Sequence, residues 1–280
     1  ENANDDGNGG NSMIERMSFN QITLDPWSLD RCVRECERLG IPFIAVWRHK
    51  LGNVKDSAKL IREAGLRMSS LCRGGWFSAE TKAERRTKMD DNRKAIDEAA
   101  ELGSPLLVIV TGPAHGQTLD DARQLVVDSL AELAPHAANA GVALGIEPLH
   151  PMFAADRSVV VTLKQANDIA EKIAHPAVGV VVDVFHVWWD PEIYAEIARA
   201  GKNILGFHVS DWAVPLPGVL MGRSLMGDGV IELRRLREAV ERAGYHGPIE
   251  VEIFNDNLWK NADNGMLELI CERYRRHVLP

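Results

Sequence analysis

The sequence has few cysteines, no long apolar run and no excess of positive charge. Its four cysteines form no CxxC pair, so we expect reduced, buried thiols and not a disulfide framework or a thiolate metal site. No apolar run is long enough to cross a bilayer. The formal net charge of −8 at pH 7 argues against nucleic acid or an anionic membrane surface as the main partner. Together these features favour a cytoplasmic protein.

The first residues differ in composition from the rest of the chain. Residues 1–12, ENANDDGNGGNS, are rich in Asn, Asp and Gly and lack both an apolar anchor and the apolar core of a signal peptide. We therefore predict a flexible tail at 1–12 and a single folded domain at 13–280.

Beyond this tail, eight apolar stretches typical of buried strands alternate with eight helical patterns. The expected strands are 15–24, 41–47, 66–72, 105–110, 142–148, 178–184, 204–210 and 248–254. The expected helices are 27–39, 55–64, 80–102, 118–140, 162–173, 191–200, 231–243 and 257–276. Five helical patterns end in a glycine that suits a C-terminal cap with positive φ, namely Gly40, Gly65, Gly103, Gly141 and Gly244.

This alternation predicts an α/β fold of one domain, the closed (β/α)₈ TIM barrel, which typically takes about 250 residues. The alternative is an open doubly wound sheet, which usually carries a glycine-rich phosphate loop after its first strand. The stretch FNQITLDPW after the first expected strand contains no glycine. The barrel is therefore the favoured interpretation.

The last four expected strands each deliver one side chain that can bind a metal. These are Glu147 in GIEPLHP, Asp183 in VVVDVFH, His208 in GFHVSDW and Glu252 in EVEIFN. Functional groups of a TIM barrel gather where its strands end. Three carboxylates brought together there would raise one another's pKa values, and a divalent cation removes that repulsion. We therefore predict one metal ion held by these four side chains. We expect Mn²⁺, with Mg²⁺, Co²⁺ or Zn²⁺ as alternatives for three oxygens and one nitrogen.

The same stretches resemble the sugar phosphate isomerase/epimerase family, the xylose isomerase-like TIM barrels that include tagatose 3-epimerase and inosose-processing enzymes. Six motifs carry the resemblance in order: EPLHP, DVFH, FHVSDW, GRSLMGDGVIEL, GYHG and VEIF. The resemblance implies that the four residues above are the metal ligands and that Glu147 and Glu252 are also the acid/base pair. It further implies that His186 and Arg223 hold substrate oxygens, and that the protein forms a homo-oligomer as many relatives do.

Other polar and aromatic residues lie close to the expected strand ends. His115, His150 and Trp188 are candidate substrate contacts, with loop structure or packing as the alternative role for each. Arg157 is a weaker candidate of the same kind. Glu250 lies two residues before Glu252 and therefore on the same side of the strand, either as a substitute ligand or as part of the barrel interior.

Two stretches depart from the family pattern. The second expected strand reads IAVWRHK where relatives often carry a glutamate, and the seventh ends in SDW. Both lie near the expected pocket, so we expect a substrate that differs from those of the best-known epimerases. The sequence offers no clear phosphate cradle, which favours an unphosphorylated substrate.

The leading hypothesis is a metal-dependent isomerase or epimerase of a keto-sugar or polyol that works through a metal-stabilised enediolate. The second is a lyase, a dehydratase or 3-keto-glycoside eliminase, because the same enolate can expel a β-substituent. A DNA-repair endonuclease of similar fold requires further His and Asp ligands, and no DxH stretch occurs between Asp211 and Glu252. The last alternative is a barrel that binds a ligand but has no enzyme activity, and it does not explain the four predicted metal ligands.

Overall fold

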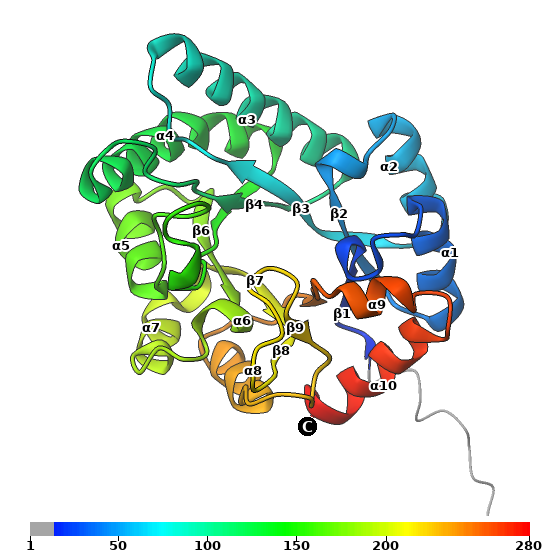
Figure 1. The fold of residues 1–280 in the computed structure, drawn as a ribbon. Coiled ribbons are helices and arrows are strands. Elements are labelled where there is room, and N and C mark those ends of the chain that lie inside the picture. Colours follow the sequence, from blue (N-terminus) through cyan, green and yellow to red (C-terminus); the bar gives the residue numbers. More distant parts are fainter. Residues whose placement is uncertain (1–13) are drawn as a thin grey trace, which may run out of the picture.

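The computed structural model describes residues 14–280, and these form a closed barrel of eight parallel strands ringed by helices (Figure 1). The strands are β1 (Met17–Asn20), β2 (Phe43–Trp47), β3 (Arg67–Gly75), β4 (Leu106–Val110), β5 (Ala143–Ile146), β6 (Val178–Asp183), β7 (Ile204–Val209) and β10 (Ile249–Val251). Their order around the barrel is β1-β10-β7-β6-β5-β4-β3-β2. The predicted TIM barrel is confirmed. The tail predicted at 1–12 lies outside the described residues.

The outer helices follow the strands in the expected alternation. They are α1 (Leu29–Leu39), α2 (Val54–Glu63), α3 (Lys82–Leu102), α4 (Leu119–Ala140), α5 (Leu163–Ile173), α7 (Ile193–Ala200), α8 (Leu233–Arg242) and α10 (Met266–His277). The five glycines expected at helix ends all have positive φ, between 71° and 107°. All four cysteines are free and buried. No helix within residues 14–280 is long and apolar enough to cross a membrane.

The elements differ from the prediction in several places. Residues 21–24, expected within the first strand, form a 3-10 helix, and β3 continues past residue 72 to Gly75. The single helix expected at 257–276 is two helices, α9 (Asp256–Lys260) and α10. The first helix ends at Lys260, and Gly265, with a φ of 69°, lies directly before α10 in a left-handed conformation that separates the two helices. The short antiparallel pair β8 (Asp211–Trp212) and β9 (Arg223–Ser224) is additional. Two-residue strands leave no periodic pattern in the sequence.

The barrel interior beneath the strand ends is filled by a small apolar cluster. Its buried members are Cys72, Leu106, Val108 and Val181. Gly145 of β5 makes room for two of them, because a Cβ there would lie 2.7 Å from Val181 Cγ2 and 2.8 Å from Leu106 Cδ1. Large and small side chains thus alternate on facing strands, as close packing of a barrel interior requires.

Gly145→Ala is expected to lower the free energy of unfolding by about 1–3 kcal/mol, the usual cost of overpacking a filled core. Gly52→Ala is the control, since a Cβ at Gly52 meets nothing within 4 Å. Chemical denaturation of both variants measures the difference. Equal denaturation midpoints for the two variants would show that the interior has more room than this packing implies.

Candidate metal centre and active site

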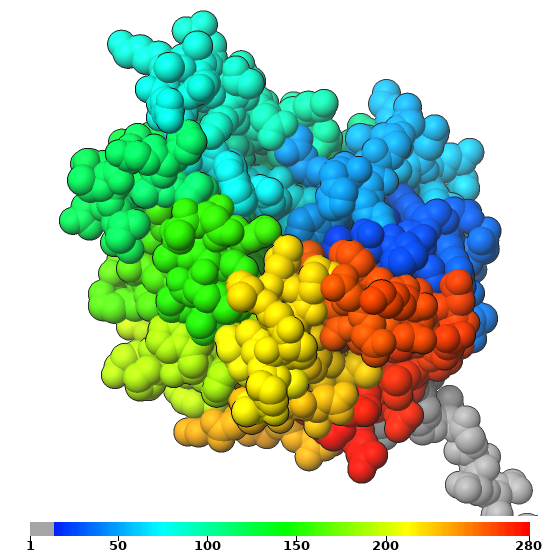
Figure 2. Space-filling view, in the orientation of Figure 1, coloured from blue at the N-terminus to red at the C-terminus, as the bar shows by residue number. Residues whose placement is uncertain are grey.

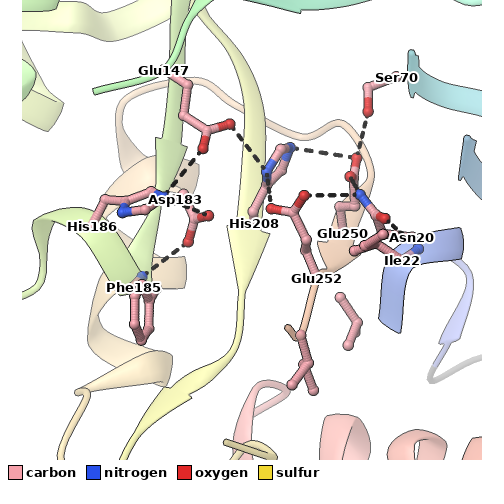
Figure 3. Close-up of polar contacts among 12 residues, drawn as sticks. Asn20, Ile22, Ser70, Glu147, Asp183, Phe185, His186, His208, Glu250 and Glu252 are labelled. Carbon is pink, nitrogen blue, oxygen red and sulfur yellow. Dashed lines mark hydrogen bonds and ion pairs between the residues drawn. The ribbon is translucent and has the colours of Figure 1, made fainter. Parts of the chain in front are cut away.

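Four neighbouring strands bring the predicted ligands together at one end of the barrel (Figure 3). Glu147 follows β5, Asp183 ends β6, His208 lies in β7 and Glu252 follows β10. The strand register sets Asp183 directly beside His208. One ligand atom from each of the four buried side chains lies within 4.8 Å of the others, so this group can hold a metal ion.

His208 gives the most direct test of whether a metal fits this group. Its Nδ1 lies 3.5 Å from Glu252 Oε2 and 3.7 Å from Glu147 Oε2. Within residues 14–280 neither this buried nitrogen nor Nε2 of the same ring has a hydrogen-bond partner, and only Nδ1 faces two of the other predicted ligands. A buried polar atom without a partner is costly. An imidazole nitrogen aimed at carboxylate oxygens is the donor set of a divalent cation site, so the residues present fit the ion.

The charge balance of the group points the same way. Four buried carboxylates, those of Glu147, Asp183, Glu250 and Glu252, surround one guanidinium and one imidazole. Burial lowers the pKa of His208, but the surrounding carboxylates, led by that of Glu250, outweigh burial and raise it to about 10. Even a protonated imidazole leaves two negative charges unbalanced. A divalent cation that replaced the imidazole proton would reduce this excess to one negative charge.

The two glutamates differ in their electrostatic surroundings. Burial raises the pKa of Glu147 well above its ordinary value, and the charges of Glu252 and Asp183 raise it further. Burial also acts on Glu252, but His208 and Arg223 outweigh it and hold the pKa of that carboxyl below its ordinary value. The surroundings thus shift the pKa values of the two glutamates in opposite directions, as different roles in acid–base chemistry require.

Glu250 supports the far side of the imidazole. Its Oε2 lies 3.4 Å from His208 Nε2 and accepts hydrogen bonds from the hydroxyls of Ser69 at 3.0 Å and Ser70 at 2.9 Å. Asn20 donates to its other oxygen at 2.7 Å. With its donors already in place, Glu250 orients the imidazole so that Nδ1 faces the metal group.

Glu250→Gln is expected to weaken metal binding by about 10–100-fold, the usual effect of losing such a supporting carboxylate. An amide keeps the size of the side chain but removes the charge that faces His208 Nε2. Titration of the metal-free protein with Mn²⁺ measures the change. Glu241→Gln is the control, because Glu241 pairs with Arg16 and Arg237 away from the site. Unchanged Mn²⁺ affinity in Glu250→Gln would remove Glu250 from this role.

Arg223 and His186 lie next to the metal group and also line the cavity beside it. Arg223 Nη1 donates to Asp183 Oδ2 at 2.9 Å, and its Nη2 lies 3.1 Å from His186 Nε2. Burial lowers the pKa of His186 to about 3, so the imidazole is neutral at pH 7. The segment after β7 carries Arg223 and lies beside the segment around α9 (Figure 2). There the amide of Asn255 donates to the Arg223 carbonyl at 2.7 Å, which fixes the arginine.

A cavity of about 460 Å³ lies against this group. Of the four predicted ligands, Glu147 and Glu252 line it, together with His186 and Arg223. Its aromatic lining residues are Trp47, His49, Trp76, Phe153, Phe185 and Phe254. Concave sites with an apolar wall and a few convergent polar groups are typical of small-molecule binding. Flat aromatic faces suit the C–H faces of a sugar.

Comparison with known proteins agrees with this geometry. Residues 33–271 match the family described as xylose isomerase-like TIM barrel. The chain belongs to this family.

Several proteins of known name or structure are similar to this barrel. A 3-dehydroshikimate dehydratase of Pseudomonas putida is 29% identical over 198 residues, which is 65% of this chain but only 29% of that protein. An L-ribulose-5-phosphate 3-epimerase, UlaE, of Salmonella paratyphi A is 25% identical over 219 residues, 76% of this chain and 72% of the epimerase. The crystal structure of protein SMc04130 from Sinorhizobium meliloti 1021 is 46% identical, with a TM-score of 0.91 over 94% of this chain and 98% of that chain.

Three predicted substrate contacts of this xylose isomerase-like barrel lie outside the residues that line the cavity. His115 lies at the surface, with 52% of its side chain exposed, 3.3 Å from Glu80. His150 packs on Trp212 with ring centroids 5.0 Å apart, and its Nδ1 accepts the Met152 N–H. Trp188 packs in the same aromatic group, 5.6 Å from Trp212. His150 and Trp188 thus support the cavity wall from behind.

Other residues of the site escaped the sequence interpretation. Arg73 lines the cavity from the end of β3, and Asn20, which ends β1, donates to both Glu250 and Glu252. Applying the strand-end criterion to the third strand would have found Arg73, which directly follows its expected end at 72. Asn20 lay inside the first expected strand, 15–24, and only the structure shows that β1 ends there. The AVWRHK departure places Trp47 in the cavity wall. In the SDW departure, Asp211 instead accepts backbone N–H groups of the loop that carries Arg223.

Proposed function

We propose that the protein is a divalent-metal-dependent isomerase or epimerase of a keto-sugar or related polyol. One observation carries the proposal: Glu147 and Glu252 both belong to the group that can hold the ion and both line the cavity. They are therefore the two carboxylates of the metal group that can reach a substrate. Three oxygens and one nitrogen without a thiolate make Mn²⁺ the first ion to test.

In this proposal the chain's own residues move and place protons. Glu147, Asp183, His208 and Glu252 would hold a divalent ion, which would supply Lewis-acid polarisation of the substrate carbonyl and so acidify the C–H next to it. One of the two glutamates removes that proton, and the electron pair of the C–H bond moves into the resulting enolate. For epimerisation the other glutamate returns a proton to the opposite face of the same carbon. For isomerisation the hydroxyl proton moves between the two oxygens of the enediolate, and a proton is returned to the former carbonyl carbon.

Arg223 and neutral His186 serve to position the substrate. Both line the cavity beside the two glutamates, and each can hold a substrate oxygen. The guanidinium also stays 2.9 Å from Asp183, so it can couple the position of the substrate to the metal group. The aromatic wall limits the access of water to the enolate, which favours its reprotonation by a glutamate.

The second candidate is a lyase that uses the same enolate. Its support is the similarity to the Pseudomonas putida 3-dehydroshikimate dehydratase, while the similarity to the Salmonella 3-epimerase supports the first candidate. In a lyase the enolate expels a β-hydroxyl or β-alkoxy group, which a general acid protonates as it leaves. Both candidates begin with the same proton abstraction.

Product mass and ultraviolet absorbance separate the two. The Mn²⁺-loaded enzyme is incubated in deuterated water with ketohexoses, inososes, 3-keto-glycosides and their acidic counterparts. An epimerase or isomerase is expected to give a product of unchanged skeleton with solvent deuterium at the α-carbon. Loss of water or an alcohol, with a new conjugated enone band, would favour the lyase. Absence of α-hydrogen exchange with every ketone in the panel would contradict both.

A further inference from the structure

We infer that the cavity contains a second binding region, formed by Arg73 and Arg157, that takes an anionic group of the substrate, a carboxylate or a phosphate. This inference rests on the proposed function for the identity of the rest of the substrate. It concerns the part of the cavity away from the metal group, and it names the class of substrate: a ketone that carries an oxyanion.

The barrel topology separates this region from the metal group. Arg73 lies near the end of β3, which is four strands away from β7 in either direction around the ring. Arg73 therefore lies across the barrel mouth from the strand that carries His208. Arg157 lies in the loop after β5, beyond Pro151–Phe153. Both arginines line the same cavity as Glu147 and Glu252, so one ligand can contact both ends.

The guanidinium of Arg73 faces the cavity without a partner for its N–H groups among the described residues. Within residues 14–280 it makes no hydrogen bond and has no carboxylate oxygen within 4.0 Å. Its guanidinium carbon lies 4.1 Å from the centre of the Trp76 ring. Stacking on an aromatic face leaves the five N–H donors of an arginine free to bind in the plane of the guanidinium.

Arg157 also has no carboxylate within hydrogen-bond distance among residues 14–280. Its nearest carboxylate is that of its chain neighbour Asp156, at 4.0 Å, which is beyond hydrogen-bond distance, and 68% of that aspartate side chain is exposed. Its guanidinium carbon lies 5.8 Å from the centre of the Phe153 ring. Burial lowers the pKa of Arg73, and the positive charges of Arg157 and Arg48 lower it further. Asp91 also lines the cavity but accepts hydrogen bonds from Arg48, so among residues 14–280 neither Arg73 nor Arg157 has a carboxylate within hydrogen-bond distance.

The other two arginines that line the cavity, Arg48 and Arg223, both pair with carboxylates. Arg48 donates two hydrogen bonds of 2.9 Å to Asp91 and one of 2.6 Å to Glu98, and Arg223 is held by Asp183. The chain has 40 acidic residues against 32 basic ones, so carboxylates are plentiful. Two unpaired arginines next to two paired ones leave room for an anion supplied by the ligand, and forked N–H donors match both carboxylate and phosphate.

Binding of three matched polyols tests the inference without any turnover. Ribitol, ribonate and ribitol 5-phosphate share a five-carbon chain and have no ketone, so none can undergo the proposed reaction. Isothermal titration of the full-length, Mn²⁺-loaded protein is expected to show at least one of the two anions binding about 10-fold or more tightly than ribitol. The tighter anion identifies the source, a sugar acid or a sugar phosphate.

Substitution of Arg73 and Arg157 tests whether these two residues cause the tighter binding of the anion. Arg73→Ala and Arg157→Ala are expected to remove most of the preference for the anion while leaving the affinity for ribitol within about 3-fold, since each removes one charge-assisted contact. Retained ribitol binding also shows that the variant is folded. Arg73→Lys keeps the charge but not the forked donors and is expected to be intermediate. Arg86→Ala, an exposed arginine on α3, is the control and is expected to behave as wild type.

The outcomes distinguish this inference from the proposed function. Equal affinity for all three polyols would overturn the anion region, as would an anion preference that survives in both Ala variants, because the anion would then be bound at the metal. Metal-dependent α-hydrogen exchange with a neutral ketose would still support the proposed function in that case. Conversely, anion binding through Arg73 and Arg157 without such exchange on any ketone would leave the anion region standing and remove the proposed function.

Discussion

Glu147→Gln and Glu252→Gln are each expected to lower kcat/KM by at least about 100-fold, the usual scale for a general acid or base. An amide of the same size cannot accept the α-proton or return one. Both side chains line the cavity and lie within 4 Å of His208 Nδ1, so each change acts on the chemistry and on the metal group together. Rates must therefore be compared per bound metal ion, with the ion measured in every preparation.

Glu101→Gln provides the control for these two variants. Glu101 is exposed at the end of α3, away from the cavity, so wild-type activity is expected. A Glu252→Gln enzyme that holds a full complement of metal and turns over at the wild-type rate would exclude Glu252 as the proton-transferring base. The same result for Glu147 would exclude it as the partner.

Asp183→Ala and His208→Ala are expected to lower activity by about 1,000-fold or more, because loss of the ion removes several kcal/mol of transition-state stabilisation. Neither side chain lines the cavity, so a direct effect on the substrate is not expected. Activity assays across a range of Mn²⁺ concentrations measure the loss and show whether added metal restores it.

A matched variant separates metal loss from misfolding in this experiment. Asp211→Ala also removes a buried carboxylate after β7, but one that accepts backbone N–H groups of Gly227 and Ile231. It is expected to destabilise the loop while the protein still binds Mn²⁺. Wild-type activity at low Mn²⁺ in Asp183→Ala or His208→Ala would show that the reaction does not depend on this ion site.

The barrel and the metal group were predictable from sequence for the same physical reason. Parallel strands buried on both faces give continuous apolar runs, and a lone carboxylate at the end of such a run, as at Asp183, stands out. Chain order then places successive strand ends side by side, because β5, β6 and β7 are neighbours in the ring. Spatial proximity of Glu147, Asp183 and His208 therefore followed from topology alone.

The features that could not be predicted from the sequence depend on packing between residues that are far apart in the chain. His115 follows β4 and was expected in the pocket, but its side chain lies at the surface beside Glu80. The strand expected to end at 72 continues to Gly75, and this extension carries Arg73 into the cavity. The partners of Glu250 come from β1 and β3, two strands far from it in sequence. No local pattern encodes such contacts.

The most direct test of the metal centre is anomalous diffraction from crystals of the protein grown with Mn²⁺, with data collected on both sides of the manganese absorption edge. One anomalous peak is expected inside the barrel mouth, within about 2.0–2.4 Å of ligand atoms of Glu147, Asp183, His208 and Glu252, the range for oxygen and nitrogen ligands of such ions. The imidazole contact is expected through Nδ1. A fully ordered site without a peak, or manganese bound only elsewhere on the protein, would contradict the account.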